Sequence, residues 1–378
     1  MHDPNKKTIA VVINTSWNIF NFRMGLLKAL KEEGYHIVAI APYDFHTEKL
    51  IEYGFEYHDI KINNKGTNPI EEIKLVKEFY KVYKEVNPDL LLQYTIKPNL
   101  YGTMAACMLD IPIISNISGL GTVFLNKKPS SLLARFLYKM ALHRKAPKKV
   151  FFQNQNDRAL FVKSKLVKKK KTDILPGSGI DTEKFKPVAR EPRKAKRLHF
   201  LFIARLIRDK GLGEYVDAAR MLKSKYPEAV FNILGTYYPG NPTAVTHDEI
   251  EMWEEEGIIH HLGATDEVSA VIAEHDCVVL PSYREGLARV LLEGASMAKP
   301  IVTTNVPGCK DVVADGISGY LCKVKDADSL AQQMEKVLLL SEDERSEMGQ
   351  RGREKVIAEF DEKIIIEKYK KAIRKIFK

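Results

Sequence analysis

Two glutamates, Glu285 and Glu293, lie eight residues apart where an apolar segment passes through a loop into a run of small and aliphatic residues. Cys277 to Leu280 has the composition of a buried strand, and Gly286 to Met297 has the spacing of a packed helix. The first amides of a helix lie at the positive end of its dipole, where a phosphate or a carboxylate binds. We expect Glu285 at the mouth of such an anion site and Glu293 on its flank. The amides expected to face the anion are those of Gly286, Leu287, Ala288 and Arg289.

Two cations follow another apolar run. The sequence RLIRDKG comes shortly after Leu198 to Ile203 and carries Arg205 and Lys210. A guanidinium and an ammonium directly after a strand can neutralise a diphosphate. Each feature alone has a simpler explanation, because surface cations are usually solvated and an acid near a helix start often only caps it. Together, the cations and the spaced glutamates favour a phosphate site.

Alternating strand and helix patterns organise the chain around these residues. Lys7 to Asn14, Tyr35 to Ala41 and Phe55 to Ile60 have strand patterns separated by helices, which is the opening of a doubly wound parallel sheet. A second series of this kind follows the polar, proline-bearing segment Pro187 to Arg197. We therefore predict an α/β protein with domains at 1–186 and 198–358. A basic amphipathic helix at 359–378 is expected to pack back on the first domain.

The composition limits the class of protein. The length of 378 residues and the net charge of +10 fit two globular domains with an affinity for polyanions. The chain has no apolar run of 18 residues and no apolar leader, so we expect a cytosolic protein without a spanning helix. Its four cysteines are scattered, without a C-x-x-C pair, and predict reduced thiols.

The E-x7-E spacing, preceded by Pro-Ser and followed by a small-residue helix, resembles the signature of retaining nucleotide-sugar glycosyltransferases of family 4. These enzymes have the GT-B fold, in which two Rossmann-like doubly wound domains face each other across a cleft. By that resemblance Arg205 and Lys210 bind the leaving diphosphate. Glu285 binds the transferred sugar, and Glu293 holds the ribose hydroxyls. The further donor contacts that it implies are Gly263 and Thr265 along the uracil, and Asn241.

Several short motifs resemble a bacterial subgroup of this family whose members extend glycans on undecaprenyl diphosphate. They are FNFR at 20–23, TIKPNLYG at 95–102, GLG at 119–121, GNP at 240–242 and PGC at 307–309. The resemblance implies transfer of N-acetylhexosamine, in the first place N-acetylgalactosamine in alpha-1,3 linkage, from UDP to a polyprenyl-diphosphate-linked sugar. The residues that it assigns to the acceptor are Arg23, Lys97, Asn99, Gly119 and Gly121. The two cations among them are candidates for the acceptor diphosphate, with an ordinary surface charge as the alternative.

Two features of many relatives are missing from the sequence. The first loop has Asn14-Thr15-Ser16-Trp17 in place of a glycine pair, and Ile117-Ser118-Gly119 stands where a histidine is common. No catalytic base is therefore assigned. We expect the departing diphosphate oxygen to take the acceptor proton on the same face of the sugar. No cofactor or metal is expected, since the D-x-D motif Asp326-Ala327-Asp328 directly precedes a helix and predicts a cap.

The segment from Lys127 to Lys149 combines an apolar helical face with many cations and no acidic residue. Such a helix can lie in a membrane interface, with its apolar side chains among acyl chains and its cations on lipid phosphates. The basic run Lys163 to Lys171 extends the same surface, while a core helix with a solvated basic face is the alternative. The residues expected to contact anionic lipid of the cytoplasmic leaflet are Arg135, Phe136, Lys139, Met140, Arg144 and Lys145.

Two other functions stay open at this point. A UDP-sugar 2-epimerase uses the same two-domain cleft, but epimerases need no lipid surface and lack the E-x7-E pattern. A nucleic-acid-binding or scaffold protein would suit the charge, but the basic segments lack the interleaved aromatic residues that nucleic-acid binding predicts. A dinucleotide oxidoreductase is disfavoured because no G-x-G-x-x-G follows the first strand.

Overall fold

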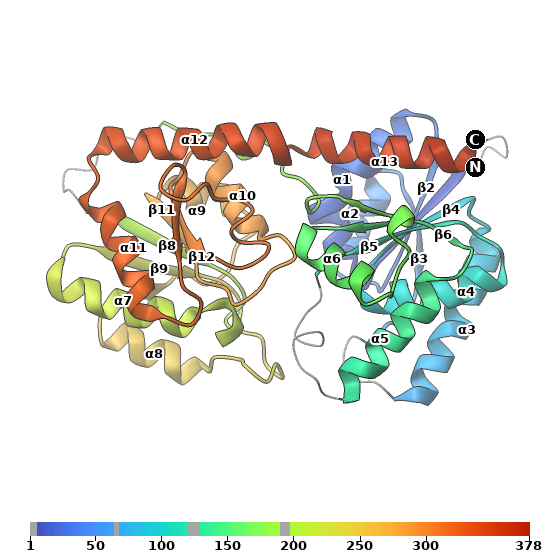
Figure 1. Cartoon of the computed structure of the whole chain (residues 1–378), viewed down its shortest axis with the longest axis horizontal. Helices are drawn as coiled ribbons and strands as arrows, with labels where there is room; N and C mark the ends of the chain where they lie inside the picture. The colour runs from blue at the N-terminus through green and yellow to red at the C-terminus, as the bar shows by residue number, and fades with distance from the viewer. Residues whose placement is uncertain (1–5, 64–67, 120–128, 190–196) are drawn as a thin grey trace. The chain divides into compact units, whose positions relative to one another are not determined.

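The chain forms two compact units in a computed structural model that describes residues 6–63, 68–119, 129–189 and 197–378. Unit 1 comprises residues 1–178 and 362–378, and unit 2 comprises residues 179–361 (Figure 1). The division therefore falls at 178/179 and 361/362, whereas the sequence placed the domain bounds at 186, 198 and 358. Gly179 and Ile180 belong to unit 2 because they bond to it: the Ile180 amide donates to the Phe360 carbonyl at 2.9 Å. Most of the polar segment Pro187 to Arg197 between the two predicted domains, residues 190–196, lies outside the described residues.

Unit 1 is built on a seven-stranded sheet in the order β3-β2-β1-β4-β5-β6-β7, with every neighbouring pair parallel. Alternate residues of its central strand enter different cores, because side chains along a strand point to opposite faces. Ile9 and Val11 pack with α1 (Ser16–Glu32) and α13 (Glu362–Phe377), whereas Ala10 and Val12 pack with α3 (Pro69–Val86) and α4 (Thr103–Met108). The strands are β1 (Thr8–Val12), β2 (His36–Ala41), β3 (Glu56–Asp59), β4 (Leu90–Tyr94), β5 (Ile113–Ile117), β6 (Pro147–Phe152) and β7 (Thr172–Ile174).

The helices of unit 1 start where the local sequence satisfies their first amides. Thr15 caps α1 by accepting a hydrogen bond from the Asn18 amide, so the helix begins at Ser16. The helix α13 lies beside α1 (Figure 1), and its Ile365 and Ile373 are buried in the same core. The helical segments are α1 (Ser16–Glu32), α2 (Thr47–Glu52), α3 (Pro69–Val86), η1 (Pro98–Gly102), α4 (Thr103–Met108), α5 (Pro129–Leu142), α6 (Gln155–Lys163), η3 (Lys169–Lys171) and α13 (Glu362–Phe377).

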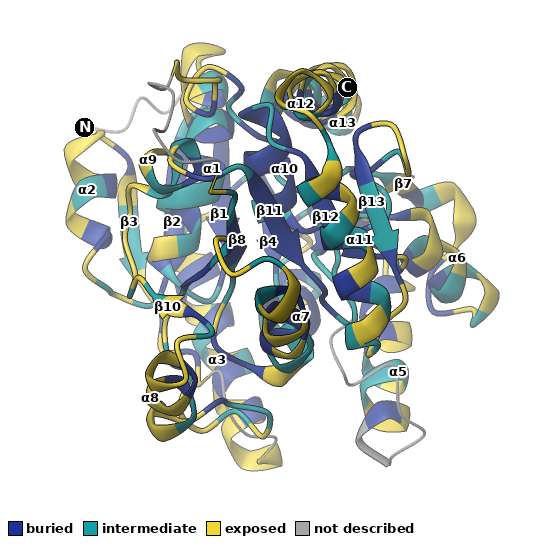
Figure 2. Cartoon of the chain, turned by 90° about the vertical axis from the view of Figure 1, so that its left-hand side faces the viewer, coloured by how far each residue is buried: buried dark blue, intermediate teal, exposed yellow. Residues whose placement is uncertain are grey.

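Unit 2 repeats the architecture with six strands in the order β10-β9-β8-β11-β12-β13, again all parallel. Its central strands are buried, while the helices over them have an exposed outer face (Figure 2). The strands are β8 (His199–Ile203), β9 (Val230–Leu234), β10 (His260–His261), β11 (Cys277–Leu280), β12 (Ile301–Thr304) and β13 (Gly319–Cys322). The helical segments are η4 (Arg208–Lys210), α7 (Leu212–Lys225), α8 (His247–Glu255), α9 (Val268–Ala273), α10 (Arg289–Ser296), α11 (Ala327–Leu339) and α12 (Glu342–Phe360).

Both sheets have the doubly wound order in which the connections change direction between two central strands. These strands are β1 and β4 in unit 1, and β8 and β11 in unit 2. In open parallel sheets of this kind, ligands bind beyond the carboxyl ends of the strands at that change of direction. The prediction of two doubly wound parallel sheets is thus confirmed, and the topology indicates which loops form the sites.

Candidate active site

The change of direction in unit 2 brings the loop after β8 against the loop after β11. The Tyr283 amide donates to the Asp209 carbonyl at 3.0 Å, and the Ser282 hydroxyl donates to the same oxygen at 3.3 Å. Gly211 has a φ of +78°, and a Cβ atom at this position would lie 2.2 Å from the Pro281 carbonyl oxygen. Only glycine allows this conformation and this approach together. The two loops that sequence reasoning singled out therefore form one edge.

Lys210 and Glu285 meet at this edge in an ion pair. The Lys210 ammonium contacts a carboxylate oxygen of Glu285, and the side chains are only 19% and 14% exposed. A ligand that enters here finds a cation and an anion in direct contact. Such a pair can hold a phosphate oxygen on its nitrogen side and a sugar hydroxyl on its carboxylate side.

The start of α10 differs from the prediction. The helix begins at Arg289, not at Gly286. The Ala288 amide donates to the Gly308 carbonyl at 2.9 Å, so it is not available to an anion in this structure. The anion contacts of Gly286, Leu287, Ala288 and Arg289 stay predictions, and a contact with the Ala288 amide would require this hydrogen bond to break. Gly308 has a φ of +81°, and its Cβ would lie 2.5 Å from the Glu285 carbonyl oxygen, so a glycine is required under the site.

Glu293 lies one turn into α10 and is almost fully buried, with 9% of the residue exposed. Arg289 donates its Nε–H to a Glu293 oxygen at 2.9 Å and an Nη1–H to the Gly179 carbonyl at 3.1 Å. Burial nevertheless raises the pKa of Glu293, because the desolvation of the carboxylate outweighs the attraction of Arg289 and Lys184. Burying a carboxylate costs free energy, and an acidic side chain with a pKa shifted in this way is typical of a binding site.

If Glu293 holds the ribose, as the resemblance implies, replacing it with glutamine is expected to weaken UDP binding about 10- to 100-fold without a loss of stability. Because the pKa of Glu293 is raised in the folded state, its contribution to stability is lost as the pH rises through that pKa. The variant should therefore gain thermal stability relative to the wild type at about pH 8, and gain less at about pH 4. Thermal unfolding at both pH values, with and without UDP, measures both effects. If UDP protected the variant from thermal unfolding as well as it protects the wild type, Glu293 would not bind the ribose.

The other predicted donor residues lie in three loops at this edge of unit 2. Arg205 is exposed, and its guanidinium carbon lies 4.6 Å from the centre of the Tyr238 ring, which sequence reasoning did not single out. The Asn241 side chain stabilises its own loop by accepting a hydrogen bond from the Thr243 amide at 2.9 Å. This aromatic contact has no signal in the sequence, because no spacing links the loops after β8 and β9.

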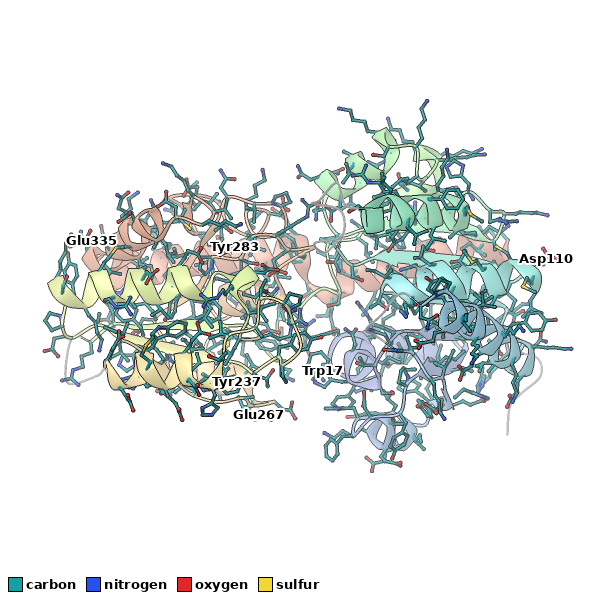
Figure 3. All side chains as sticks on the ribbon, turned by 90° about the horizontal axis from the view of Figure 1, so that it is seen from below. Trp17, Asp110, Tyr237, Glu267, Tyr283 and Glu335 are labelled. Atoms are coloured by element: carbon teal, nitrogen blue, oxygen red, sulfur yellow. The ribbon has the colours of Figure 1, made fainter. Side chains whose placement is uncertain are left out.

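The loops after β9 and β10 also lie together. The Gly235 amide donates to the Gly263 carbonyl at 2.8 Å, and the Thr265 hydroxyl accepts from the Glu267 amide at 3.0 Å. Tyr237 and Glu267, labelled in Figure 3, mark the two loops. The contacts of Asn241, Gly263 and Thr265 to a nucleotide stay predictions, but all three belong to loops at the same edge of unit 2.

In unit 1 the predicted acceptor residues have different surroundings. Arg23 is 7% exposed, and its guanidinium carbon lies 4.3 Å above the Tyr94 ring. Lys97 donates to Glu72 at 2.6 Å, so its charge is already balanced. Asn99 is 1% exposed and bonds to the Thr95 and Asn116 carbonyls, which makes it a support for the loop after β4.

The two glycines assigned to the acceptor lie after β5. Gly119 has a φ of +132°, and Gly121 lies outside the described residues. Thr95, at the end of β4, has a φ of +62°, which is strained for a β-branched residue. Strain of this kind gathers at functional loops. The roles of the acceptor residues stay predictions, and Arg23 has the surroundings that fit an anion best.

The D-x-D motif caps a helix, as predicted: the Asp326 side chain accepts a hydrogen bond from the Ser329 amide at 2.8 Å at the start of α11. Within the described ranges, no three histidine, cysteine or acidic side chains gather as metal ligands would. None of the helices in these ranges combines the length and hydropathy needed to cross a bilayer.

Two all-parallel doubly wound sheets define the GT-B fold class, and solved structures share it. The chain aligns with a glycosyltransferase from Rickettsia africae at a TM-score of 0.80 and 19% identity, covering 99% of both chains. It also aligns with Anabaena Alr3699/HepE in complex with UDP and glucose at a TM-score of 0.77 and 16% identity, covering 98% of this chain and 99% of the other.

The sequence comparisons define the particular family. Residues 8–154 match the family described as glycosyl transferase 4-like, and residues 183–355 match glycosyl transferases group 1. The chain is therefore a hexosyltransferase of the GT-B fold and belongs to these glycosyltransferase families. A Campylobacter jejuni relative, N,N'-diacetylbacillosaminyl-diphospho-undecaprenol alpha-1,3-N-acetylgalactosaminyltransferase, is 29% identical over 96% of both chains. An Escherichia coli relative, UDP-Gal:alpha-D-GlcNAc-diphosphoundecaprenol alpha-1,3-galactosyltransferase, is 23% identical over 71% of both.

Proposed function

We propose that this glycosyltransferase moves N-acetylhexosamine, most specifically N-acetylgalactosamine, from UDP to a sugar carried on undecaprenyl diphosphate, in alpha-1,3 linkage and with retention. The names of both curated relatives support the proposal. They share a diphosphoundecaprenol-linked acceptor and an alpha-1,3 linkage, and they differ in the sugar transferred. The relative that aligns over 96% of the chain transfers N-acetylgalactosamine, which favours that donor.

The observation that carries the proposal is the contact between Lys210 and Glu285 at the change of direction of unit 2. A donor bound at this edge would place its diphosphate on Lys210 and Arg205. Its sugar would then lie at Glu285, and its ribose at Glu293. A single ligand that carries a diphosphate between two sets of hydroxyl groups uses all four side chains, and a UDP-sugar is such a ligand.

The proposed transfer accounts for every bond and for the acceptor proton without a base from the protein. The bond between the anomeric carbon and the UDP oxygen breaks, and the bond from the acceptor hydroxyl oxygen to that carbon forms on the same face. The hydroxyl proton passes to the departing diphosphate oxygen, whose developing charge Lys210 and Arg205 stabilise. Retention of the anomeric configuration follows from attack on the face from which UDP leaves.

A transfer assay tests the proposal and its alternatives together. The enzyme is incubated with UDP-N-acetylgalactosamine, UDP-N-acetylglucosamine, UDP-galactose or UDP-glucose, with or without a polyprenyl-diphosphate-linked sugar. We expect transfer only with acceptor, fastest from UDP-N-acetylgalactosamine, and an alpha anomer by NMR. A beta product contradicts retention. Epimerised UDP-sugar without acceptor would support a 2-epimerase, and protection from thermal unfolding by DNA but not by UDP would support a nucleic-acid-binding protein.

The acceptor lipid requires contact with a membrane, and α5 has a surface that fits. Its Leu132, Leu133 and Phe136 side chains are 65%, 53% and 59% exposed, while Tyr138 and Leu142 on its other face are buried in unit 1. Exposed apolar side chains on a helix without acids are typical of a membrane-interface helix. We place the protein peripherally on the cytoplasmic leaflet. The apolar and basic residues at and beyond this surface include Arg135, Lys139, Met140, Arg144 and Lys145.

Changing Arg135, Lys139, Arg144 and Lys145 to glutamate should weaken binding to anionic liposomes at least about 10-fold, since each cation near such a surface contributes about 1 kcal/mol. Flotation with anionic and neutral liposomes measures the effect. Changing four exposed cations of unit 2 provides the matched control with the same change in charge. These control positions are Arg197, Lys225, Lys323 and Arg351. Equal loss in both variants would show that net charge, not α5, attracts the lipid.

A further inference from the structure

Unit 1 contains a buried cation that faces neutral groups. Arg23, on α1, is 7% exposed, and its Nε atom has no hydrogen-bond partner in the described part of the chain. The same residue lines a small cavity at the carboxyl ends of β4, β5 and β6. The polar residues that share this cavity, Tyr94, Asn116, Ser118 and Gln153, are all uncharged.

A buried guanidinium without a counter-ion is costly, because desolvation is not repaid by an ion pair. Among the described residues no carboxylate forms a salt bridge with Arg23. The cation is instead stacked on the Tyr94 ring at 4.3 Å. An incoming anion would supply the missing partner of Arg23, which lines the cavity.

A tyrosine of the last helix fixes the ring beneath this cation. The Tyr94 hydroxyl donates to the Tyr369 hydroxyl at 2.8 Å, and the Tyr369 hydroxyl donates to the Asn116 side-chain oxygen at 2.6 Å. The Asn116 amide group in turn donates to the Gln93 carbonyl at 3.3 Å. Tyr94 and Tyr369 are fully buried, and burial raises the pKa of both, so both remain donors across the working pH range.

The helix that brings Tyr369 is held firmly on unit 1. Ile365 and Ile373 are buried on either side of it, and Arg374 pairs with Glu33 of unit 1. Tyr369 thus reaches a partner 275 positions earlier in the chain. The hydrogen-bonded series Tyr94–Tyr369–Asn116 leaves the Tyr94 ring with one orientation, and Arg23 packs on that ring.

We infer that Tyr369 is a positioning residue for an anion site at Arg23, and that the last helix of the chain thereby completes the acceptor side of unit 1. The inference rests on the proposed function, in which Arg23 binds the diphosphate of the lipid-linked acceptor. Tyr369 does not contact the acceptor. It fixes the Tyr94 ring, and the Arg23 guanidinium packs on that ring at the wall of the cavity.

Calorimetric titration with inorganic pyrophosphate tests the inference. The full chain is first saturated with UDP, so that the phosphate site of unit 2 is filled. Tyr369→Phe should weaken pyrophosphate binding about 10-fold, because it breaks two buried hydrogen bonds next to Arg23. Arg23→Gln should abolish binding. The matched control is Tyr83→Phe, which removes a buried tyrosine hydroxyl bonded to Gln93 at 3.0 Å, in the core on the opposite face of the sheet.

Kinetics provide the second measurement. Tyr369→Phe should raise the KM for the lipid-linked acceptor about 10-fold, leave the KM for the UDP-sugar unchanged and lower kcat little. Tyr94→Phe keeps the ring but cuts its bond to Tyr369, so it should show the same selective effect if Tyr369→Phe folds poorly. A merely structural role would raise both KM values, or change neither.

The outcomes distinguish a failure of the role of Tyr369 from a failure of the anion site at Arg23. Normal pyrophosphate binding in Tyr369→Phe and Tyr94→Phe, with loss in Arg23→Gln, overturns the role of Tyr369 and keeps Arg23 on the acceptor side. Normal binding in Arg23→Gln, or none in the wild type, overturns the anion site and the inference together. An equal loss in Tyr83→Phe would reduce the effect to general destabilisation and would also overturn the inference.

Discussion

Replacing Lys210 with alanine is expected to lower kcat about 10²- to 10³-fold, which is the usual effect of removing one preorganised charge from a developing negative oxygen. The substitution also leaves the carboxylate of Glu285, whose side chain is 14% exposed, without its ion-pair partner. We therefore expect a fall in the free energy of unfolding of about 2 kcal/mol. Steady-state kinetics with the UDP-sugar and the lipid-linked acceptor, and chemical denaturation, measure the two effects.

The matched control is Lys223→Ala, at a lysine of unit 2 that donates to the Gly257 carbonyl away from this edge. It should leave kcat within about twofold of the wild type, since surface substitutions rarely have larger effects. Activity of Lys210→Ala within the same range would remove Lys210 from the reaction. A loss of stability without a loss of kcat would leave it with a structural role only.

Replacing Glu285 with glutamine is expected to lower kcat by a similar factor of about 10² to 10³, but with the opposite effect on nucleotide binding. The carboxylate faces the transferred sugar in the proposed complex, so UDP loses no contact. Lys210 loses its internal partner and becomes freer to bind the diphosphate. The affinity for UDP should therefore stay the same or rise, and calorimetric titration measures it.

A drop in UDP affinity that matches the drop in kcat would place Glu285 on the nucleotide instead. The double variant Lys210→Ala with Glu285→Gln refines the test. The two residues are in contact, so their effects on kcat should fall well short of the sum of the single effects. Full additivity would mean that the residues act independently.

Several features of the site were predictable because they depend on local spacing. Lys210 and Glu285 were each placed just after a strand, and parallel strands bring their carboxyl ends to one edge, so their meeting follows from the strand order. Glu293 was predicted on the flank of the anion site. The structure buries it within α10, and its contact with a ligand stays a prediction.

The remaining features depend on contacts between distant segments. The Ala288 amide donates to the Gly308 carbonyl, and no sequence pattern before Gly308 predicts that the loop after β12 passes beneath the site. Asn99 belongs to a motif typical of the subgroup, yet its side chain is buried as a support. In the sequence, Tyr369 is one apolar position of an amphipathic helix. Only the tertiary structure places its hydroxyl between Tyr94 and Asn116.

The packing of helix α5 also depends on contacts that the sequence does not predict. Its sequence predicts an apolar face and many cations, but a helical period does not reveal which apolar side chains pack inward. The structure buries Tyr138, Ala141 and Leu142 and leaves Leu132 and Phe136 exposed. The choice is made by the core formed with α6 and β6, which supply Phe161 and Phe152.

The proposed function requires that a nucleotide diphosphate binds at the edge of unit 2 where Lys210 contacts Glu285. A crystal structure of the protein soaked with UDP tests it most directly. We expect the diphosphate on Lys210 and Arg205, with the ribose hydroxyls bonded to Glu293. UDP bound at any other place, or a ribose out of reach of Glu293, would contradict it.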